Sequence, residues 1–182
     1  GAQIELVSVF AREQKLKNAF AEVQDEYDYI IIDCPPNLGL LTVNALTAAD
    51  VFIVPMQTEF LAMEGLAQLL NTVRMIKSSL NPALEMEGVV LTMFDKRAAL
   101  HNQVVKEIQN HFGDKVFKTI IPKNIRLAEC PSYGKPIILY DIKSTGCSAY
   151  LALAKELILK ERMAQVQQSA NNHMGSENTL GV

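Results

Sequence analysis

The sequence predicts an α/β fold, a doubly wound and mostly parallel sheet with helices on both faces. Two observations predict it. Short runs of β-branched and other apolar residues are typical of buried strands, and longer segments between them carry apolar residues at helical spacing. Because every predicted crossover contains a helix, consecutive strands should be parallel, with right-handed connections. A chain of 182 residues, 49% of them hydrophobic, can bury one sizeable core.

The predicted elements alternate along the chain. A helix with Leu16, Phe20 and Val23 on one face precedes the first strand. The predicted strands lie at residues 29–33, 51–55, 88–94 and 116–121, and the later helices at 38–48, 62–76, 100–112 and 150–158. Asn81-Pro82 and Gly113 mark the ends of two helices, because proline cannot continue a helix and glycine readily closes one.

The composition changes near the end of the chain. From Gln165 onward Gln, Asn, Ser and Gly dominate, with few large apolar residues. Such a segment buries too little apolar surface to offset the entropy of ordering it. We therefore expect a single domain over residues 1–164 and a polar, disordered tail over 165–182.

The composition also excludes several classes of protein. No apolar run approaches the ~18 residues that span a bilayer, and the first residues lack a basic region followed by an apolar core. We therefore expect a cytoplasmic protein without a membrane role. Cys34, Cys130 and Cys147 are an odd number and have no C-x-x-C spacing, which favours buried free thiols over disulfides or a zinc site.

The first predicted strand ends in the most informative residue, Asp33, which follows three isoleucines and precedes Cys34-Pro35-Pro36. Ligands of parallel sheets bind beyond the carboxyl ends of the strands. A carboxylate there can hold a magnesium ion through a bound water, since Mg²⁺ gives up its waters reluctantly. This is the form of a Walker B element. The alternative is that Asp33 only ends the strand and accepts backbone N–H groups of the turn.

A nucleotide site of this kind also needs a glycine-rich loop, G-x-x-x-x-G-K-[ST], whose backbone N–H groups hold phosphates. The 182 residues contain no such loop. Their one Gly-Lys pair, Gly134-Lys135, is followed by Pro136 and has Glu129 where the first glycine would stand. The chain is therefore either no NTPase or one part of an NTPase.

Six ordered motifs favour the second interpretation. They lie at residues 27–36, 42–46, 54–57, 91–95, 121–129 and 131–136, within a match that covers about residues 1–160. Together they resemble the ParA/Soj family of chromosome- and plasmid-partitioning ATPases, which have the P-loop NTPase fold with a deviant Walker A loop. The family's N-terminal segment, with that loop, its signature lysine and the catalytic aspartate, is not in these 182 residues, so the fold is expected to lack its N-terminal strands.

The resemblance implies a function for the parent protein, meaning the protein that joins this chain to such a loop. It implies an ATP hydrolase that uses ATP and Mg²⁺, forms a homodimer on ATP binding, and binds duplex DNA non-specifically at the nucleoid. It also implies a ParB-type partner that stimulates hydrolysis. In this frame Asp33 is the catalytic residue that orients magnesium through water, and Pro35 and Pro36 belong to a switch that senses the γ-phosphate.

A nucleotide base would lie beside two later motifs. Met93 ends the third predicted strand, and Pro122, Lys123 and Asn124 follow the fourth, so both groups should meet at the carboxyl edge of the sheet. An adenine needs a flat apolar contact and a few amide hydrogen bonds, which these residues can supply. Ordinary loop chemistry is the alternative, since Asn and Pro are common turn residues.

The distribution of charge allows DNA binding although the whole chain carries −3. Residues 95–143 hold nine Lys and Arg against five Asp and Glu, a net charge of +4. A local basic surface is enough for phosphate contacts. Arg97, Lys123 and Arg126 lie in motifs that match basic DNA-contacting positions of the family, whereas Lys106 and Lys115 are expected to be merely solvated.

Two other functions remain as alternatives. One is a non-enzymatic fragment that binds DNA or a partner. The other is a membrane-associated positioning ATPase of the MinD type, which would need a basic helix with an apolar face at the C-terminus, whereas this end is polar.

A last expectation concerns assembly. The family's P-loop strand lies between strands 30–33 and 51–55, so without it these strands should face a gap, and the chain should rearrange, exchange strands with a second copy or aggregate.

Overall fold

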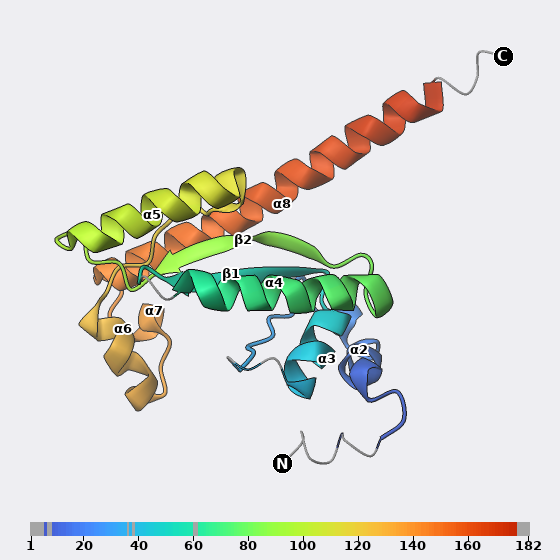
Figure 1. Ribbon diagram of the computed structural model, residues 1–182, viewed down its shortest axis with the longest axis horizontal. Helices are drawn as coiled ribbons and strands as arrows, with labels where there is room; N and C mark the ends of the chain where they lie inside the picture. Colours follow the sequence, from blue (N-terminus) through green and yellow to red (C-terminus); the bar gives the residue numbers. More distant parts are fainter. Residues whose placement is uncertain (1–5, 7–8, 36, 38, 60–61, 178–182) are drawn as a thin grey trace. The chain divides into compact units, whose positions relative to one another are not determined.

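The computed structural model describes residues 6, 9–35, 37, 39–59 and 62–177. Their elements, in chain order, are η1 (Arg12–Gln14), α2 (Lys15–Phe20), η2 (Gln24–Glu26), α3 (Leu40–Ala48), β1 (Val51–Gln57), α4 (Ala62–Ser79), β2 (Glu85–Thr92), α5 (Ala99–Phe112), η3 (Gly113–Lys115), α6 (Ile125–Glu129), η4 (Cys130–Tyr133), α7 (Ile137–Tyr140) and α8 (Thr145–Glu177) (Figure 1). They form two compact units, one from residues 1–54 and 59–88 and one from 55–58 and 89–182.

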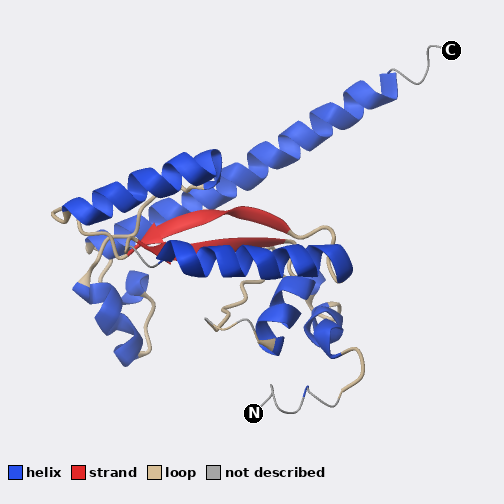
Figure 2. Ribbon diagram, viewed as in Figure 1, coloured by secondary structure: helices blue, strands red, loops and turns tan. Residues whose placement is uncertain are grey.

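The sheet of the described residues has two strands, β1 and β2, drawn as neighbouring arrows in Figure 2. The Glu85 N–H donates to the Asp50 carbonyl (3.0 Å), and the Thr58 N–H donates to the Thr92 carbonyl (3.2 Å). Residue numbers therefore rise in the same direction along both strands, which makes the pair parallel. With α4 as the crossover, this confirms the α/β fold class.

The first unit is built around the contact of α3 with α4. Leu46, Val73, Ile76 and Leu84 form its buried core. Two asparagines tie the connecting segments to α3. Asn81 donates from Nδ2 to the carbonyl oxygens at positions 46 and 49 (3.0 and 2.8 Å), where α3 ends and its carbonyls have no partner within the helix. Asn44 accepts from the Leu16 N–H (3.2 Å) and so holds α2.

The strand predicted at residues 29–33 is not present. This segment is extended, but it has no ladder partner among the described residues, and Ile31 is 90% exposed. A strand needs a ladder of backbone hydrogen bonds to a neighbour, and the sheet of the described residues consists of β1 and β2. The prediction of a buried strand from three consecutive isoleucines was therefore wrong for the described structure, which has no sheet to bury them.

The second unit pairs β2 with the segment 116–122, for which a fourth strand was predicted. The Phe117 N–H donates to the Val89 carbonyl, whereas the Leu91 carbonyl accepts from Ile121, four residues further along. The extra residues form a bulge, whose free N–H groups at Lys118 and Thr119 donate to the carboxylate of Glu156 in α8 (2.7 and 2.9 Å). The predicted strand is therefore a parallel but irregular segment rather than a regular strand.

Helix α8 anchors this unit. Its Leu153 and Leu157 pack on the buried core of Val90, Phe117 and Ile121. Gly146, in its first turn, lies so close to α6 that an added Cβ would come within 2.6 Å of the Leu127 Cγ. The helix continues to Glu177, into the segment for which the composition predicts a tail, because extending a formed helix costs far less than nucleating one.

Two of the predicted thiols behave as expected. Cys130 and Cys147 are buried and free, whereas Cys34 is free but exposed. Among the residues described above, no helix combines the length and the apolar character needed to cross a membrane.

Candidate nucleotide and DNA site

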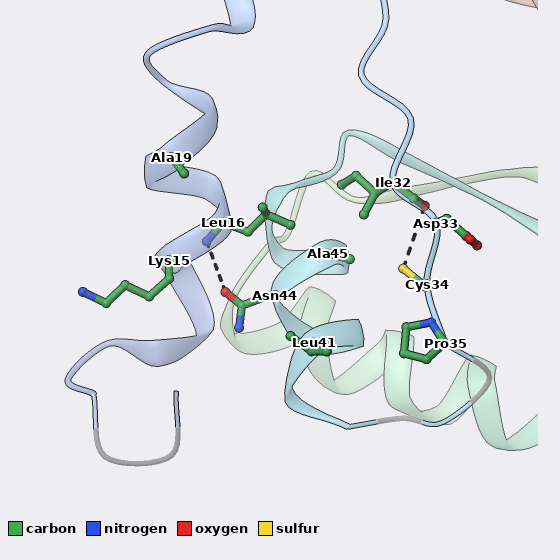
Figure 3. Close-up of a pocket in the computed structure, with 10 residues that line it drawn as sticks. All are labelled: Lys15, Leu16, Ala19, Ile32, Asp33, Cys34, Pro35, Leu41, Asn44 and Ala45. Carbon is green, nitrogen blue, oxygen red and sulfur yellow. Dashed lines mark hydrogen bonds between the residues drawn. The ribbon is translucent and has the colours of Figure 1, made fainter. Parts of the chain in front are cut away.

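A cavity of about 410 Å³ lies in the first unit between α2, α3 and the extended segment that ends at Pro35 (Figure 3). Its lining residues are Lys15, Leu16, Ala19, Ile32, Asp33, Cys34, Pro35, Leu41, Asn44 and Ala45. Most of these residues are apolar, and Lys15 of α2 and Asp33 are the charged ones.

Asp33 is exposed, and Figure 3 shows its carboxylate on the opposite side of the segment from the Cys34 thiol. The carboxylate has no hydrogen bond or ion pair to the described residues, so no backbone N–H group of that set occupies it. Although Cys34 is exposed, partial desolvation of its thiol, and then the charge of Asp33, raise the pKa of that thiol. Pro35 is exposed beside it, and Pro36 lies outside the described residues.

The structure brings the predicted base-side residues together in the second unit. The Phe94 N–H donates to the Ile121 carbonyl (3.2 Å), and the Lys123 N–H donates to the Phe94 carbonyl (2.9 Å). The loop after β2, with Met93, therefore lies directly beside the loop that carries Pro122 and Lys123. Met93 is 43% exposed and has a positive φ of 54°, a conformation that costs side chains of its kind about 1–3 kcal/mol and is common at functional sites.

Asn124 has a structural role that the sequence interpretation missed. Its Oδ1 accepts from the N–H groups of Arg126 (2.9 Å) and Leu127 (3.4 Å), and so caps α6. Its Nδ2 donates to the Thr145 Oγ1 (2.8 Å) at the start of α8. Both ends of the amide are engaged, so a base would meet the backbone of Asn124 more readily than its side chain. An Asn just before a short helical run is itself an N-cap signal.

His101 is a second residue that sequence reasoning did not identify. Its Nδ1 accepts from the Asp95 N–H (3.0 Å) and lies 2.9 Å from the Oγ1 of Thr58, which is fully buried. The ring therefore holds the loop after β2 in place. No local pattern could have found it, because its partner is a backbone group six residues away. The part of the chain that the structure describes has no cluster of His, Cys, Asp or Glu that could bind a metal by itself.

Arg97, a predicted DNA contact, forms a bidentate ion pair within its own loop. Its Nε and Nη2 donate to the two carboxylate oxygens of Asp95 (3.1 and 3.0 Å), and its backbone N–H donates to Oδ1 (3.0 Å). Hydrogen bonding to Arg97 lowers the pKa of Asp95 to about 2. The arginine side chain is nevertheless 85% exposed.

Arg126 is also paired with acids. It donates from Nη1 to Glu129 (3.0 Å), and its Nε lies 3.4 Å from Asp141. The Tyr140 hydroxyl donates to the same Glu129 oxygen (3.0 Å), and burial followed by this hydrogen bond raises the pKa of Tyr140. Lys123, by contrast, is exposed and has no ion pair to another described residue.

Comparison with known proteins identifies the family. A protein-family model described as an AAA domain matches residues 1–86. The chain is 56% identical over 161 residues to the chromosome partitioning protein ParA of Myxococcus xanthus, which covers 88% of this chain and 57% of that protein. It is 59% identical over 157 residues to the sporulation initiation inhibitor protein Soj of Bacillus subtilis, which covers 86% of this chain and 62% of Soj. The chain belongs to the ParA/Soj family.

A solved structure supports the same fold. Cobyrinic acid a,c-diamide synthase from Mycobacterium smegmatis, with a bound ATP analogue and magnesium, superposes with a TM-score of 0.63 at 33% identity, over 74% of this chain and 60% of that one. This ParA/Soj chain spans about three fifths of the length of the curated relatives named above. Of its predicted site residues, Asp33 lies in the first unit, and those of the base and DNA sites lie in the second.

Proposed function

We propose that this chain forms the C-terminal part of an ATP-dependent switch in DNA partitioning. In this proposal the parent protein dimerises on binding Mg·ATP, binds duplex DNA regardless of sequence on the nucleoid in the cytoplasm, and is stimulated to hydrolyse ATP by a ParB-type partner. The observation that carries the proposal is 56–59% identity to a ParA and a Soj over more than four fifths of the chain.

The residues present fit part of a Mg·ATP site. The exposed carboxylate of Asp33 is free to hold a magnesium-bound water, as an ion that dehydrates reluctantly requires. Magnesium would neutralise phosphate charge there. Met93 offers an apolar contact for a base, and the neighbouring Pro122 and Lys123 complete that side. The backbone N–H groups that hold phosphates would come from a glycine-rich loop that these 182 residues do not contain.

The residues of the second unit fit a phosphate-binding surface. The Lys123 N–H donates to the Phe94 carbonyl and so joins two loops. Arg97 lies in the first of these loops, and Arg126 lies in α6, directly after the second. All three basic side chains are exposed, and they belong to the stretch with a net charge of +4. Such a surface suits the phosphate backbone of a duplex, because phosphate contacts carry no sequence information.

Substitution of the two arginines in the parent protein tests the proposal. Arg97→Gln and Arg126→Gln should each weaken binding to every duplex sequence alike in the presence of Mg·ATP. Each should flatten the plot of log affinity against log salt by about one unit per lost contact. Lys106→Gln, which removes an equal charge from the solvated face of α5, is the control and should have little effect. Loss confined to one sequence, or no loss for either arginine, would contradict the proposal.

The membrane alternative has less support. Residues 165–177, at the described end of α8, contain no Lys or Arg and therefore lack the basic face that such a helix needs. Vesicles of anionic lipid should therefore not compete with duplex DNA for the parent protein in a sedimentation assay.

A further inference from the structure

The two arginines proposed to contact DNA are not free to do so without breaking existing contacts. Arg97 is held by Asp95, and Arg126 by Glu129 and Asp141. A DNA phosphate must therefore replace or share a carboxylate that already binds the guanidinium. Because Glu129 also accepts a hydrogen bond from the Tyr140 hydroxyl, substituting Glu129 would disturb Tyr140 as well as Arg126. The Asp95–Arg97 pair is the simpler one to test.

The Asp95–Arg97 pair uses the part of the arginine best suited to a phosphate. Nε and Nη2 form the edge that binds carboxylates and phosphates in a bidentate manner, and both atoms donate to Asp95. A phosphate approaching the remaining N–H groups would lie close to a like-charged carboxylate. The low pKa of Asp95, about 2, means that the carboxylate stays ionised throughout the physiological range.

Asp95 is the fixed member of the pair. Its backbone N–H donates to His101, which in turn contacts the buried Thr58. The side chain of Arg97, in contrast, projects into solvent and has several rotatable bonds. When a phosphate binds, it is therefore the arginine that moves away while the carboxylate remains in place.

We propose that Asp95 competes with DNA phosphates for Arg97 and so keeps the affinity of this loop for duplex DNA below what the arginine alone would give. The inference rests on the proposed function, because it requires Arg97 to contact DNA. The carboxylate supplies the competitor within the same loop.

The test is the affinity of the Mg·ATP-bound parent protein for a fluorescent duplex of arbitrary sequence. Asp95→Asn keeps an oxygen for the Arg97 N–H but removes the charge. It should raise the affinity, by up to about fivefold for so exposed a pair, without flattening the salt dependence. In an Arg97→Gln background the same change should bring no gain. Asp95→Ser, whose hydroxyl can also accept the N–H, serves as the second variant, and thermal unfolding verifies that each protein is folded.

Asp114→Asn is the matched control. It removes one carboxylate from the same basic stretch, but at the far end of α5, whose 14 residues span about 20 Å, roughly twice the Debye length in physiological salt. A gain from Asp95→Asn equal to that from Asp114→Asn, or no gain while Arg97→Gln still weakens binding, would overturn the inference and leave the proposed function intact. If Arg97→Gln instead left the affinity for DNA unchanged, Arg97 would not contact DNA. Both the inference about Asp95 and the proposed role of Arg97 would then fail.

Discussion

The Asp33 segment and the two loops of the second unit were both predicted as parts of one site, yet they differ in how they are held. The loops are fixed by hydrogen bonds between near neighbours in the second unit, including the His101 contact and the Asn124 cap. The Asp33 segment is joined to the described residues by no β-ladder, and two of its three isoleucines, Ile30 and Ile31, are exposed. Contacts within the second unit thus hold the two loops predicted to meet a base and DNA, whereas the segment predicted to hold magnesium lacks strand pairing among the described residues.

The largest effect should come from a substitution in the Asp33 segment. In the parent protein Asp33→Ala should reduce ATP hydrolysis by about a hundredfold or to background, since residues that orient a metal through its bound ligands typically contribute 10- to 100-fold. The measurement is phosphate release at saturating Mg·ATP. Asp28→Ala, which removes another exposed carboxylate from the same segment, is the control and should keep most of the rate. An unchanged rate for Asp33→Ala would exclude Asp33 from the mechanism.

The close contact of α6 with α8 should be the most sensitive point of the second unit. Gly146→Ala places a Cβ against Leu127 and should lower the free energy of unfolding by about 1–3 kcal/mol, as overpacking does. Gly65→Ala in α4 meets no atom within 4 Å and should instead stabilise by about 0.5–1 kcal/mol. Urea denaturation of the two variants separates these outcomes. A neutral Gly146→Ala would mean that Leu127 moves aside freely.

A smaller effect should decide whether the side chain of Asn124 caps α6 or contacts a base. Asn124→Ala removes the cap of α6 and should cost about 1 kcal/mol, whereas Asn124→Asp keeps the accepting oxygen and should cost less. If both variants bind Mg·ATP in the parent protein as the wild type does, the side chain is a cap and not a base contact. A loss of nucleotide affinity in Asn124→Asp without loss of stability would restore the original prediction.

The smallest effect concerns the titration of Asp95. A carboxyl whose pKa is depressed to about 2 stabilises the folded state above its ordinary pKa of 3.8 and loses that contribution as the pH falls toward 2. Carboxyl chemical shifts measured by NMR should therefore titrate near pH 2. In Arg97→Gln the midpoint should return toward 3.8. A midpoint that does not respond to Arg97 would show that the ion pair is absent in solution.

The same contrast explains what the sequence could predict. Helices α4 and α5 were predicted within a few residues, because their apolar stripes and their Pro and Gly boundaries are local signals. The strand predicted at 29–33 is not present. Three isoleucines favour a strand, but they say nothing about the neighbouring strand with which it must pair. The segment 116–122 became a bulge because Glu156, some 38 residues away, takes its N–H groups. That contact has no sequence signature.

The candidate site shows a similar division. Residue types at predicted strand ends located the loop of Met93 and Phe94 beside Pro122, because parallel strands bring their carboxyl ends to one edge. The Asp95–Arg97 pair and the role of His101 escaped prediction, since they depend on side-chain geometry and, for His101, on Thr58 far away in the sequence.

Titration of the 182-residue chain with Mg·ATP by calorimetry tests most directly whether these residues build only part of the nucleotide site. Asp33 by itself repels the triphosphate except through magnesium, and the base-side loops offer few contacts. The account predicts affinity much weaker than micromolar for this chain and tight binding for the parent protein. Micromolar affinity in the 182-residue chain would contradict it, because the phosphates would then be held without a glycine-rich loop.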